Sequence, residues 1–319
     1  MASRINRAIE LLQQDQAIYY TGHHTGHVLN YEAGKKDAHT WADYINIGME
    51  HGAFDLSGLE QYMRGLVDGG PTRSGHCTAA VIVELPVNGI DEPMVRNNAW
   101  QMRQILGRGV HGLLLCQAES ADAVAAFVEA ARYPHHLAGV DPELPTPLER
   151  MRGAARATHR GSTGGRKLLG IGMRGRGSEM SAAPIWGISQ EEYMERADPW
   201  PLNPNGELML GLKLESPEGI ANADELLAVP GVAFAEMGPG DLSLSLGSTR
   251  LLRDPYPPEM QAARDKVLNA CRNNRIAFLE GCNRTNLVGR LDEGVRVIGG
   301  HDEELARLGR AHQKRLMPA

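Results

Sequence analysis

Two acidic residues near the C-terminal third of the chain have the types and positions to hold a metal ion. Glu215 ends the apolar run 208–214, and Asp241 follows the apolar run 232–237 and the segment Gly238-Pro239-Gly240. A carboxylate at the C-terminal tip of a buried strand points into the mouth of an α/β barrel, where oxygen ligands can hold a divalent cation that keeps other positions for water and substrate. The alternative is a pair of helix-capping or surface carboxylates. We favour the metal site because acidic residues at barrel strand ends more often serve catalysis.

His51 is the candidate general base. It lies just beyond the apolar run 44–49 and next to Glu50. Because imidazole titrates near neutral pH, His51 could take a proton from a substrate hydroxyl through a metal-bound water. We expect Glu50 to hold the loop or that water rather than to react. The alternative for His51 is a purely structural histidine.

The segment Gly238-Pro239-Gly240 is a candidate substrate-binding loop. Glycines let a backbone approach a ligand closely, and successive backbone N–H groups can form an anion-binding concavity. We therefore expect Gly238, Pro239 and Gly240 to contact a substrate carboxylate, although an ordinary tight turn would fit the same residues.

These residues need a scaffold, and short apolar runs that alternate with longer helical patterns predict repeated βα units and a parallel sheet. Eight strands are predicted, the number that closes a barrel. They cover residues 17–21, 44–49, 79–85, 112–116, 208–214, 232–237, 276–279 and 295–298. Helices are predicted at residues 1–12, 56–68, 92–107, 120–131, 222–229, 258–274 and 302–316.

Residues 134–204 interrupt this alternation with a long segment rich in Gly, Arg and Pro. Loops of this length in a compact domain are usually active-site covers or assembly elements. A floppy surface insertion is the alternative. We favour an ordered cover because Trp186 and Trp200 would need something to bury them.

Composition limits the classes of function. The 319 residues fit one barrel domain, and 42% of them are hydrophobic. A net charge of −6 without a long basic block gives no sign of a nucleic-acid or membrane partner, so we expect a small-molecule substrate. The absence of any run of 18 apolar residues, and of paired CxxC cysteines, leads us to expect a cytoplasmic protein with four free thiols and no zinc site.

Three ordered motifs resemble the HpcH/HpaI aldolase family, the class II 2-oxo acid aldolases allied to citrate lyase. They are the segments 214–219, 229–232 and 238–247. Glu50-His51-Gly52, Arg132-Tyr133-Pro134 and the segment 295–302 are similar to further family motifs in the same order. The resemblance covers about residues 40–310, apart from the enlarged loop.

The resemblance implies a (β/α)8 TIM barrel with its enlarged loop at about 134–204. It also implies a homo-oligomer built from dimers, up to a hexamer, in which the C-terminal helix is exchanged between subunits. By the same likeness Glu215 and Asp241 ligate Mg, Mn or Co, and the ion binds a 2-oxo acid through its ketone and carboxylate oxygens.

The chain departs from the family pattern at two places. Typical relatives end the third strand with an arginine that helps to hold the 2-oxo acid, whereas this chain has Glu84-Leu85-Pro86. If Glu84 rather than Leu85 faces inward, the local charge is reversed, which disfavours an anionic ligand unless the metal offsets it. Relatives also carry an aspartate two residues before the Glu-His pair, where this chain has Gly48.

Two groups of residues could compensate for these departures. His23, His24 and His27 follow the first strand and could bind a metal, orient a substrate or supply acid-base groups, or they could be ordinary loop histidines. Arg174 and Arg176 in the long segment could replace the missing cation.

The first functional hypothesis is retro-aldol cleavage of a 4-hydroxy-2-oxo acid to pyruvate and an aldehyde by a metal-dependent lyase. A second keeps the site but assigns a less anionic, aromatic hydroxylated substrate that releases a small aldehyde, or a decarboxylation. A third is a noncatalytic barrel that binds a metabolite.

Overall fold

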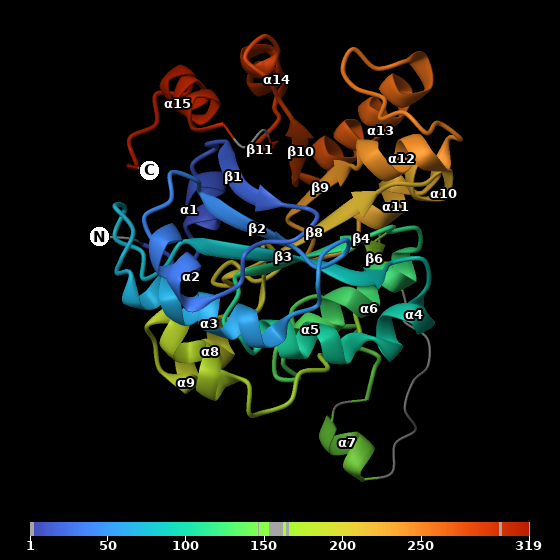
Figure 1. Cartoon of the computed structure of the whole chain (residues 1–319). Coiled ribbons are helices and arrows are strands. Elements are labelled where there is room, and N and C mark those ends of the chain that lie inside the picture. The colour runs from blue at the N-terminus through green and yellow to red at the C-terminus, as the bar shows by residue number, and fades with distance from the viewer. Residues whose placement is uncertain (1–2, 146, 153–161, 164–165, 300–301, 319) are drawn as a thin grey trace.

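The protein is a barrel of eight parallel strands, which a computed structural model describes for residues 3–145, 147–152, 162–163, 166–299 and 302–318 (Figure 1). Around the ring, β4 pairs with β3 and also with β8, and this second pairing closes the barrel. The strands are β1 (Ile18–His23), β2 (Tyr44–Gly48), β3 (Ala80–Asn88), β4 (Gly112–Cys116), β8 (Leu208–Leu214), β9 (Phe234–Met237), β10 (Ala277–Gly281) and β11 (Val297–Gly299). The predicted (β/α)8 barrel is confirmed.

Each predicted apolar run overlaps one barrel strand, and the predicted bounds of β4 and β8 are the observed ones. The largest difference is in β3, which continues past the predicted end at residue 85 to Asn88 through an irregularity between Glu84 and Asn88.

Helices separate the strands and cover the outside of the barrel (Figure 1). The helices outside the long segment are α1 (Arg7–Gln13), α2 (Tyr31–Asp37), α3 (Leu56–Asp68), α4 (Glu92–Asn97), α5 (Ala99–Leu106), α6 (Ala121–Ala131), α10 (Pro217–Ala221), α11 (Ala223–Leu227), α12 (Pro239–Ser245), α13 (Pro258–Asn274), α14 (Leu287–Glu293) and α15 (Glu303–His312). The predicted helix 92–107 is divided at Asn98, which ends α4 and begins α5. Outside the long segment, the prediction missed α2, α10, α12 and α14.

The barrel interior changes from apolar to polar along its axis. Near the amino ends of the strands, buried Ile18, Tyr44, Met209 and Phe234 pack together, and α1 packs against this group. Side chains two residues apart on a strand share a face, so the next inward position on each strand is two residues further along. At this level the inward side chains are polar. These positions are Asn46, Glu84, Cys116, Lys213 and Glu236. The four cysteines are free thiols, as predicted.

The long segment 134–204 contains short elements: α7 (Pro147–Met151), β5 (Ser162–Thr163), β6 (Arg166–Lys167), α8 (Glu179–Trp186), α9 (Gln190–Arg196) and β7 (Pro199–Trp200). Trp186 is buried and its indole N–H donates to the carbonyl of Gly109, just before β4. β7 pairs with the first residues of β8. The described part from α8 to β7 therefore packs at the amino ends of the strands, and the predicted active-site cover is wrong for these residues.

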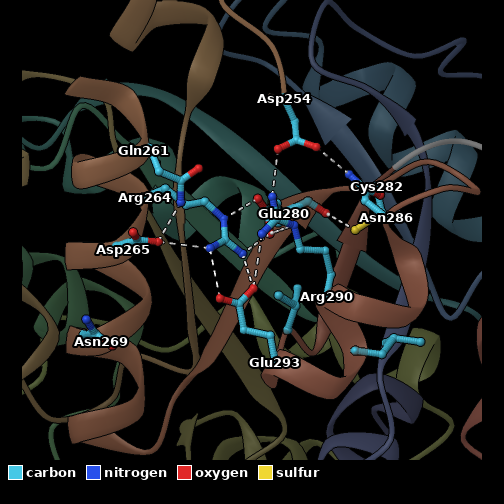
Figure 2. Close-up of polar contacts among 12 residues, drawn as sticks. Asp254, Gln261, Arg264, Asp265, Asn269, Glu280, Cys282, Asn286, Arg290 and Glu293 are labelled. Carbon is cyan, nitrogen blue, oxygen red and sulfur yellow. Dashed lines mark hydrogen bonds and ion pairs between the residues drawn. The ribbon is translucent and has the colours of Figure 1, made fainter. Parts of the chain in front are cut away.

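Figure 2 shows the polar cluster that attaches α13 and α14 to β10. Glu280 of β10 accepts from Arg264 of α13 at 2.6 and 2.7 Å. Arg264 also reaches Glu293 at the end of α14, at 2.6 Å. Among the helices of the described residues, none is both long and apolar enough to cross a membrane.

Candidate active site at the carboxyl ends of the strands

Acidic side chains from three strand ends converge at the mouth of the barrel. Glu215 follows β8, Glu50 follows β2, and Asp241 lies in the first turn of α12, directly after β9. Two sets of potential ligand atoms each lie within 4.8 Å of one another: Glu50 with Cys116 and Glu215, and Glu50 with His51 and Asp241. Among the described residues, the two carboxylates predicted as metal ligands, Glu215 and Asp241, belong to different sets, and Glu50 belongs to both.

Close packing fixes the Glu215 carboxylate. A Cβ atom built on Gly238 would lie 2.2 Å from Glu215 Oε1, so only glycine leaves room for the carboxylate there. The backbone N–H of Gln117 donates to Glu215 Oε2 at 3.1 Å, from a residue in the left-handed region with φ of 51°. The hydroxyl of Ser245 donates to the Glu215 carbonyl at 2.8 Å and so ties α12 to the end of β8.

The electrostatics of this cluster favour a divalent cation. Burial raises the pKa of Glu215 well above its ordinary value, and the nearby Glu50 and Glu236 raise it further, against the opposing charge of Lys213. Burial also raises the pKa of Glu236. Because these carboxylates repel one another in a poorly solvated site, a bound cation would relieve both the repulsion and the loss of solvation.

The carboxylates of both sets are ligands that fit Mg, Mn or Co. Carboxylate oxygens of Glu50, Glu215 and Asp241 are hard ligands, and the Asp241 side chain is 25% exposed, which leaves room for water or substrate.

His51 lies at the rim of this cluster. Its Nε2 is 3.5 Å from Glu50 Oε2 and 3.4 Å from Asp241 Oδ2, and its side chain is 46% exposed. Both distances are longer than a typical N–H···O hydrogen bond. The ring can therefore reach a proton or a water near the acidic cluster without being locked to either carboxylate.

Glu84 faces the barrel interior, whereas Leu85 packs outward with the core between barrel and helices. Glu84 Oε1 accepts from Asn46 Nδ2 at 2.6 Å and lies 2.6 Å from His24 Nδ1. Its Oε2 accepts from Lys213 Nζ at 3.1 Å. The charge at the position of the family's third-strand arginine is thus reversed.

Lys213 connects Glu50 of the acidic cluster with Glu84. Its Nζ donates to Glu50 at 2.8 Å as well as to Glu84. Burial would lower the pKa of Lys213, but its anionic neighbours raise it and keep the ammonium charged. Burial likewise would raise the pKa of Glu84, but the hydrogen bond from His24 and the charge of Lys213 lower it to about 2.

Residues 238–240 begin α12, and the predicted contact of this segment with a substrate carboxylate stays a prediction. Gly238 is the N-cap of α12, Pro239 is its first residue and has no N–H, and Gly240 continues the helix. This segment positions the Glu215 carboxylate by leaving space for it, which the sequence reasoning missed.

Other predicted residues belong to neither set of potential ligands. His27 is 3.2 Å from Asp37 of α2 and its ring packs edge-on against Tyr62 of α3, while His23 is exposed. Arg174 is buried between the rings of Tyr133 and Tyr193, in the segment that packs at the amino ends of the strands.

Arg176 is exposed in that same segment. The structure therefore places neither Arg174 nor Arg176 where it could replace the missing cation.

The sequence reasoning also missed Lys213, Asn46 and Gln117. A signal for Lys213 was present, because alternation along β8 puts residue 213 on the same face as Glu215. The position of Gln117 depends on a left-handed backbone conformation, for which this residue type gives no signal.

The sequence profile described as HpcH/HpaI aldolase/citrate lyase matches residues 35–295. The chain belongs to this family. Membership confirms the predicted resemblance, the assignment as an enzyme of the aldolase/lyase class, and a divalent metal as its cofactor. The noncatalytic hypothesis is thereby set aside.

Individual members of the HpcH/HpaI family are similar at modest identity. The hydroxypyruvate/pyruvate aldolase of Paraburkholderia phytofirmans is 25% identical over 240 residues, which are 75% of this chain and 70% of that protein. The 4-hydroxy-2-oxo-heptane-1,7-dioate aldolase of Shigella sonnei is 25% identical over 206 residues, 64% of this chain and 61% of that protein.

A solved structure supports the fold. A family protein from Burkholderia cenocepacia J2315 superposes with a TM-score of 0.63 at 21% identity, and the match covers 97% of this chain and 98% of that one.

Proposed function

We propose that this enzyme is a divalent-metal-dependent aldolase that cleaves a 4-hydroxy-2-oxo acid into pyruvate and an aldehyde. The observation that carries the proposal is the convergence of Glu50, Glu215 and Asp241 at the barrel mouth, with His51 against the same cluster. The aldolase names of the relatives from Paraburkholderia phytofirmans and Shigella sonnei support the reaction class.

In this proposal Glu215 and Asp241, with Glu50 between them, hold Mg, Mn or Co. The bound ion would supply Lewis-acid stabilisation of the negative charge that develops on the 2-oxo acid as the carbon–carbon bond breaks.

Side chains of the protein carry out the proton transfers. His51 takes the proton of the substrate 4-hydroxyl, directly or through a water, because its exposed ring stands beside Glu50 and Asp241. Loss of that proton lets the hydroxyl carbon become the aldehyde carbonyl while the bonding electrons pass to the departing pyruvate enolate. Glu50, fixed by Lys213, orients His51 or its water.

The missing third-strand arginine favours the second candidate, a less anionic substrate or a decarboxylation. The inward Glu84 disfavours a carboxylate at that position. Competition by pyruvate and by oxalate separates the candidates. Both ligands bind if the substrate is a 2-oxo acid, and failure of both to bind would exclude a 2-oxo acid substrate.

The decisive experiment is metal removal combined with a ligand variant. Chelation should abolish cleavage of a 4-hydroxy-2-oxo acid, and Mg, Mn or Co should restore it. Glu215→Gln should lower metal affinity by at least about 100-fold, judged by the 10–100-fold losses for supporting residues alone. Glu218→Gln, at an exposed position of α10, is the matched control. Full activity of metal-free enzyme would refute the mechanism.

We also propose a cytoplasmic homo-oligomer formed by this single barrel domain with its insertion at 134–204. Exposed Leu308 on α15 and Leu316 in the tail support a subunit contact at this end of the chain. Arg310 and Arg315 tie α15 and the tail to Asp43 of the same chain, and an exchanged helix would make these contacts with a partner. Light scattering after size-exclusion chromatography tests the assembly, and a monomer at all concentrations would exclude it.

A further inference from the structure

A second acid-base pair, His24 with Glu84, faces the barrel mouth apart from His51. His24 Nδ1 lies 2.6 Å from Glu84 Oε1, which is shorter than either contact of His51 with a carboxylate. The Glu84 side chain is fully buried, whereas the His24 side chain is 41% exposed. A buried carboxylate thus holds one ring nitrogen of a histidine whose side chain stays partly exposed.

Strand geometry explains how His24 reaches the mouth. Tyr20 of β1 faces the barrel interior, and residue 24, four positions further on, continues the same face just beyond the strand. A Cβ atom built on Gly48 would lie 2.0 Å from the carbonyl oxygen of His24 and 2.7 Å from that of His23. The loss of the family's aspartate at residue 48 is therefore what lets the histidine loop pack against the end of β2.

The charges around His24 come from several strands. Glu84 on β3 is in direct contact, Glu236 on β9 and Lys213 on β8 act at longer range, and the Tyr20 hydroxyl of β1 is 3.5 Å from Nε2. The hydrogen bond to Glu84 is the largest influence, and it raises the pKa of His24 above the ordinary histidine value. His24 is thereby suited to carry a proton near neutral pH.

We propose that His24, positioned by Glu84, is the group that protonates the methylene carbon of the pyruvate enolate. The inference rests on the proposed aldolase function. With Nδ1–H donating to Glu84, Nε2 carries the transferable proton.

After one turnover, His51 and His24 have returned to their starting protonation states. His51 removes the hydroxyl proton, the carbon–carbon bond breaks, and the enolate carbon takes the proton of His24 Nε2 to become the methyl group of pyruvate. His51 then releases its proton to solvent, and the exposed His24 regains one, so the enzyme returns to its starting state.

Exchange of pyruvate methyl protons in D₂O tests this step without the cleavage reaction. The exchange runs the same proton transfer in both directions, so neutral His24 must first remove a methyl proton. NMR of pyruvate with metal-loaded His24→Asn should show exchange slowed by about 10²- to 10⁴-fold. His24→Ala should regain part of the rate when imidazole is added, which a purely structural role would not give.

His27→Asn is the matched control, because His27 pairs with Asp37 on the outer side of the barrel and should leave the exchange rate unchanged. Glu84→Gln should move the midpoint of the exchange pH profile to lower pH, because the neutral amide no longer stabilises the imidazolium.

The outcomes separate this inference from the proposed function. If the wild-type enzyme exchanges no methyl protons, the pyruvate aldolase proposal fails. If the wild type exchanges methyl protons and His24→Asn does so at the same rate, only the role of His24 is overturned. The same follows if imidazole does not raise the exchange rate of His24→Ala and the midpoint of the Glu84→Gln pH profile equals that of the wild type.

Discussion

Lys213 on β8 donates across the barrel interior to Glu84 on β3, with 3.1 Å between Nζ and Oε2. In typical relatives the cation stands at the end of the third strand, but here that strand supplies the carboxylate and the fifth barrel strand supplies the cation. Because Lys213 also donates to Glu50, one ammonium connects the acidic cluster with the Glu84–His24 pair. This cation is therefore already shared between two carboxylates.

Replacing Lys213 with methionine should lower the unfolding free energy, because Glu50 and Glu84 then repel each other without a cation between them. Removing one partner of a buried ion pair leaves an uncompensated charge and typically costs about 3–5 kcal/mol of unfolding free energy. Urea unfolding in EDTA should show a loss of this size for Lys213→Met. Because a divalent cation that binds the folded protein is attracted by the unbalanced charge, adding Mn should reduce the stability difference between Lys213→Met and the wild type.

Lys36→Met, at an exposed position of α2, is the control for removing a lysine. Equal stability of Lys213→Met and the wild type in EDTA would show that the ammonium does not balance the cluster.

Gly238→Ala should weaken metal binding specifically. The added Cβ would lie 2.2 Å from Glu215 Oε1 and must displace the carboxylate. We expect metal affinity, measured by calorimetry, to fall by about 10- to 100-fold, the range for residues that orient metal ligands. Gly240→Ala is the control, because a Cβ there would have no atom within 4 Å among those described. Equal losses in both variants would contradict a specific role for the space at Gly238.

The sequence predicted the acidic cluster because its signal is local. Glu215 and Asp241 each follow an apolar run that could be recognised as a buried strand, and the strand ends of a parallel barrel meet at one face. The pairing of His24 with Glu84 depends instead on the packing of the β1 loop against Gly48, a contact between separate strands. Sequence alone left His24 among several loop histidines for this reason.

The long segment was harder to place because it has little periodicity. The prediction that Trp186 would be buried was correct, but the tryptophan packs beside His111 at the amino end of β4 rather than over the mouth. Aromatic content indicates that a segment is ordered, and it does not say which end of a barrel the segment covers.

Glu84 should make stability depend on pH in the acid range. Its pKa in the folded protein is lowered from 4.5 to about 2, so its contribution is fully present above about pH 4.5 and is lost as the pH falls toward 2. The shift corresponds to about 3 kcal/mol, since one pKa unit is worth 1.36 kcal/mol.

The measurement compares urea unfolding of wild type and Glu84→Gln between pH 5 and 2. Other groups that titrate in this range, such as His111, whose pKa burial lowers to about 3, are common to both proteins. The difference in unfolding free energy between the two proteins should shrink by about 3 kcal/mol as the pH is lowered. A difference that stays constant over this range would mean that Glu84 is not held as a carboxylate by His24 and Lys213.

Arg264→Met should destabilise the side of the barrel formed by α13, β10 and α14 (Figure 2). The buried guanidinium binds Glu280 through two hydrogen bonds and Glu293 through two more, so its loss leaves the nearly buried Glu280 without its main partner. We expect about 3–5 kcal/mol of lost unfolding free energy, measured by urea denaturation. Arg307→Met, at an exposed position of α15, should change stability by less than about 1 kcal/mol, because its ion pair with Glu304 is solvated. Similar effects of the two substitutions would mean that the Glu280 cluster adds no more to stability than a surface ion pair.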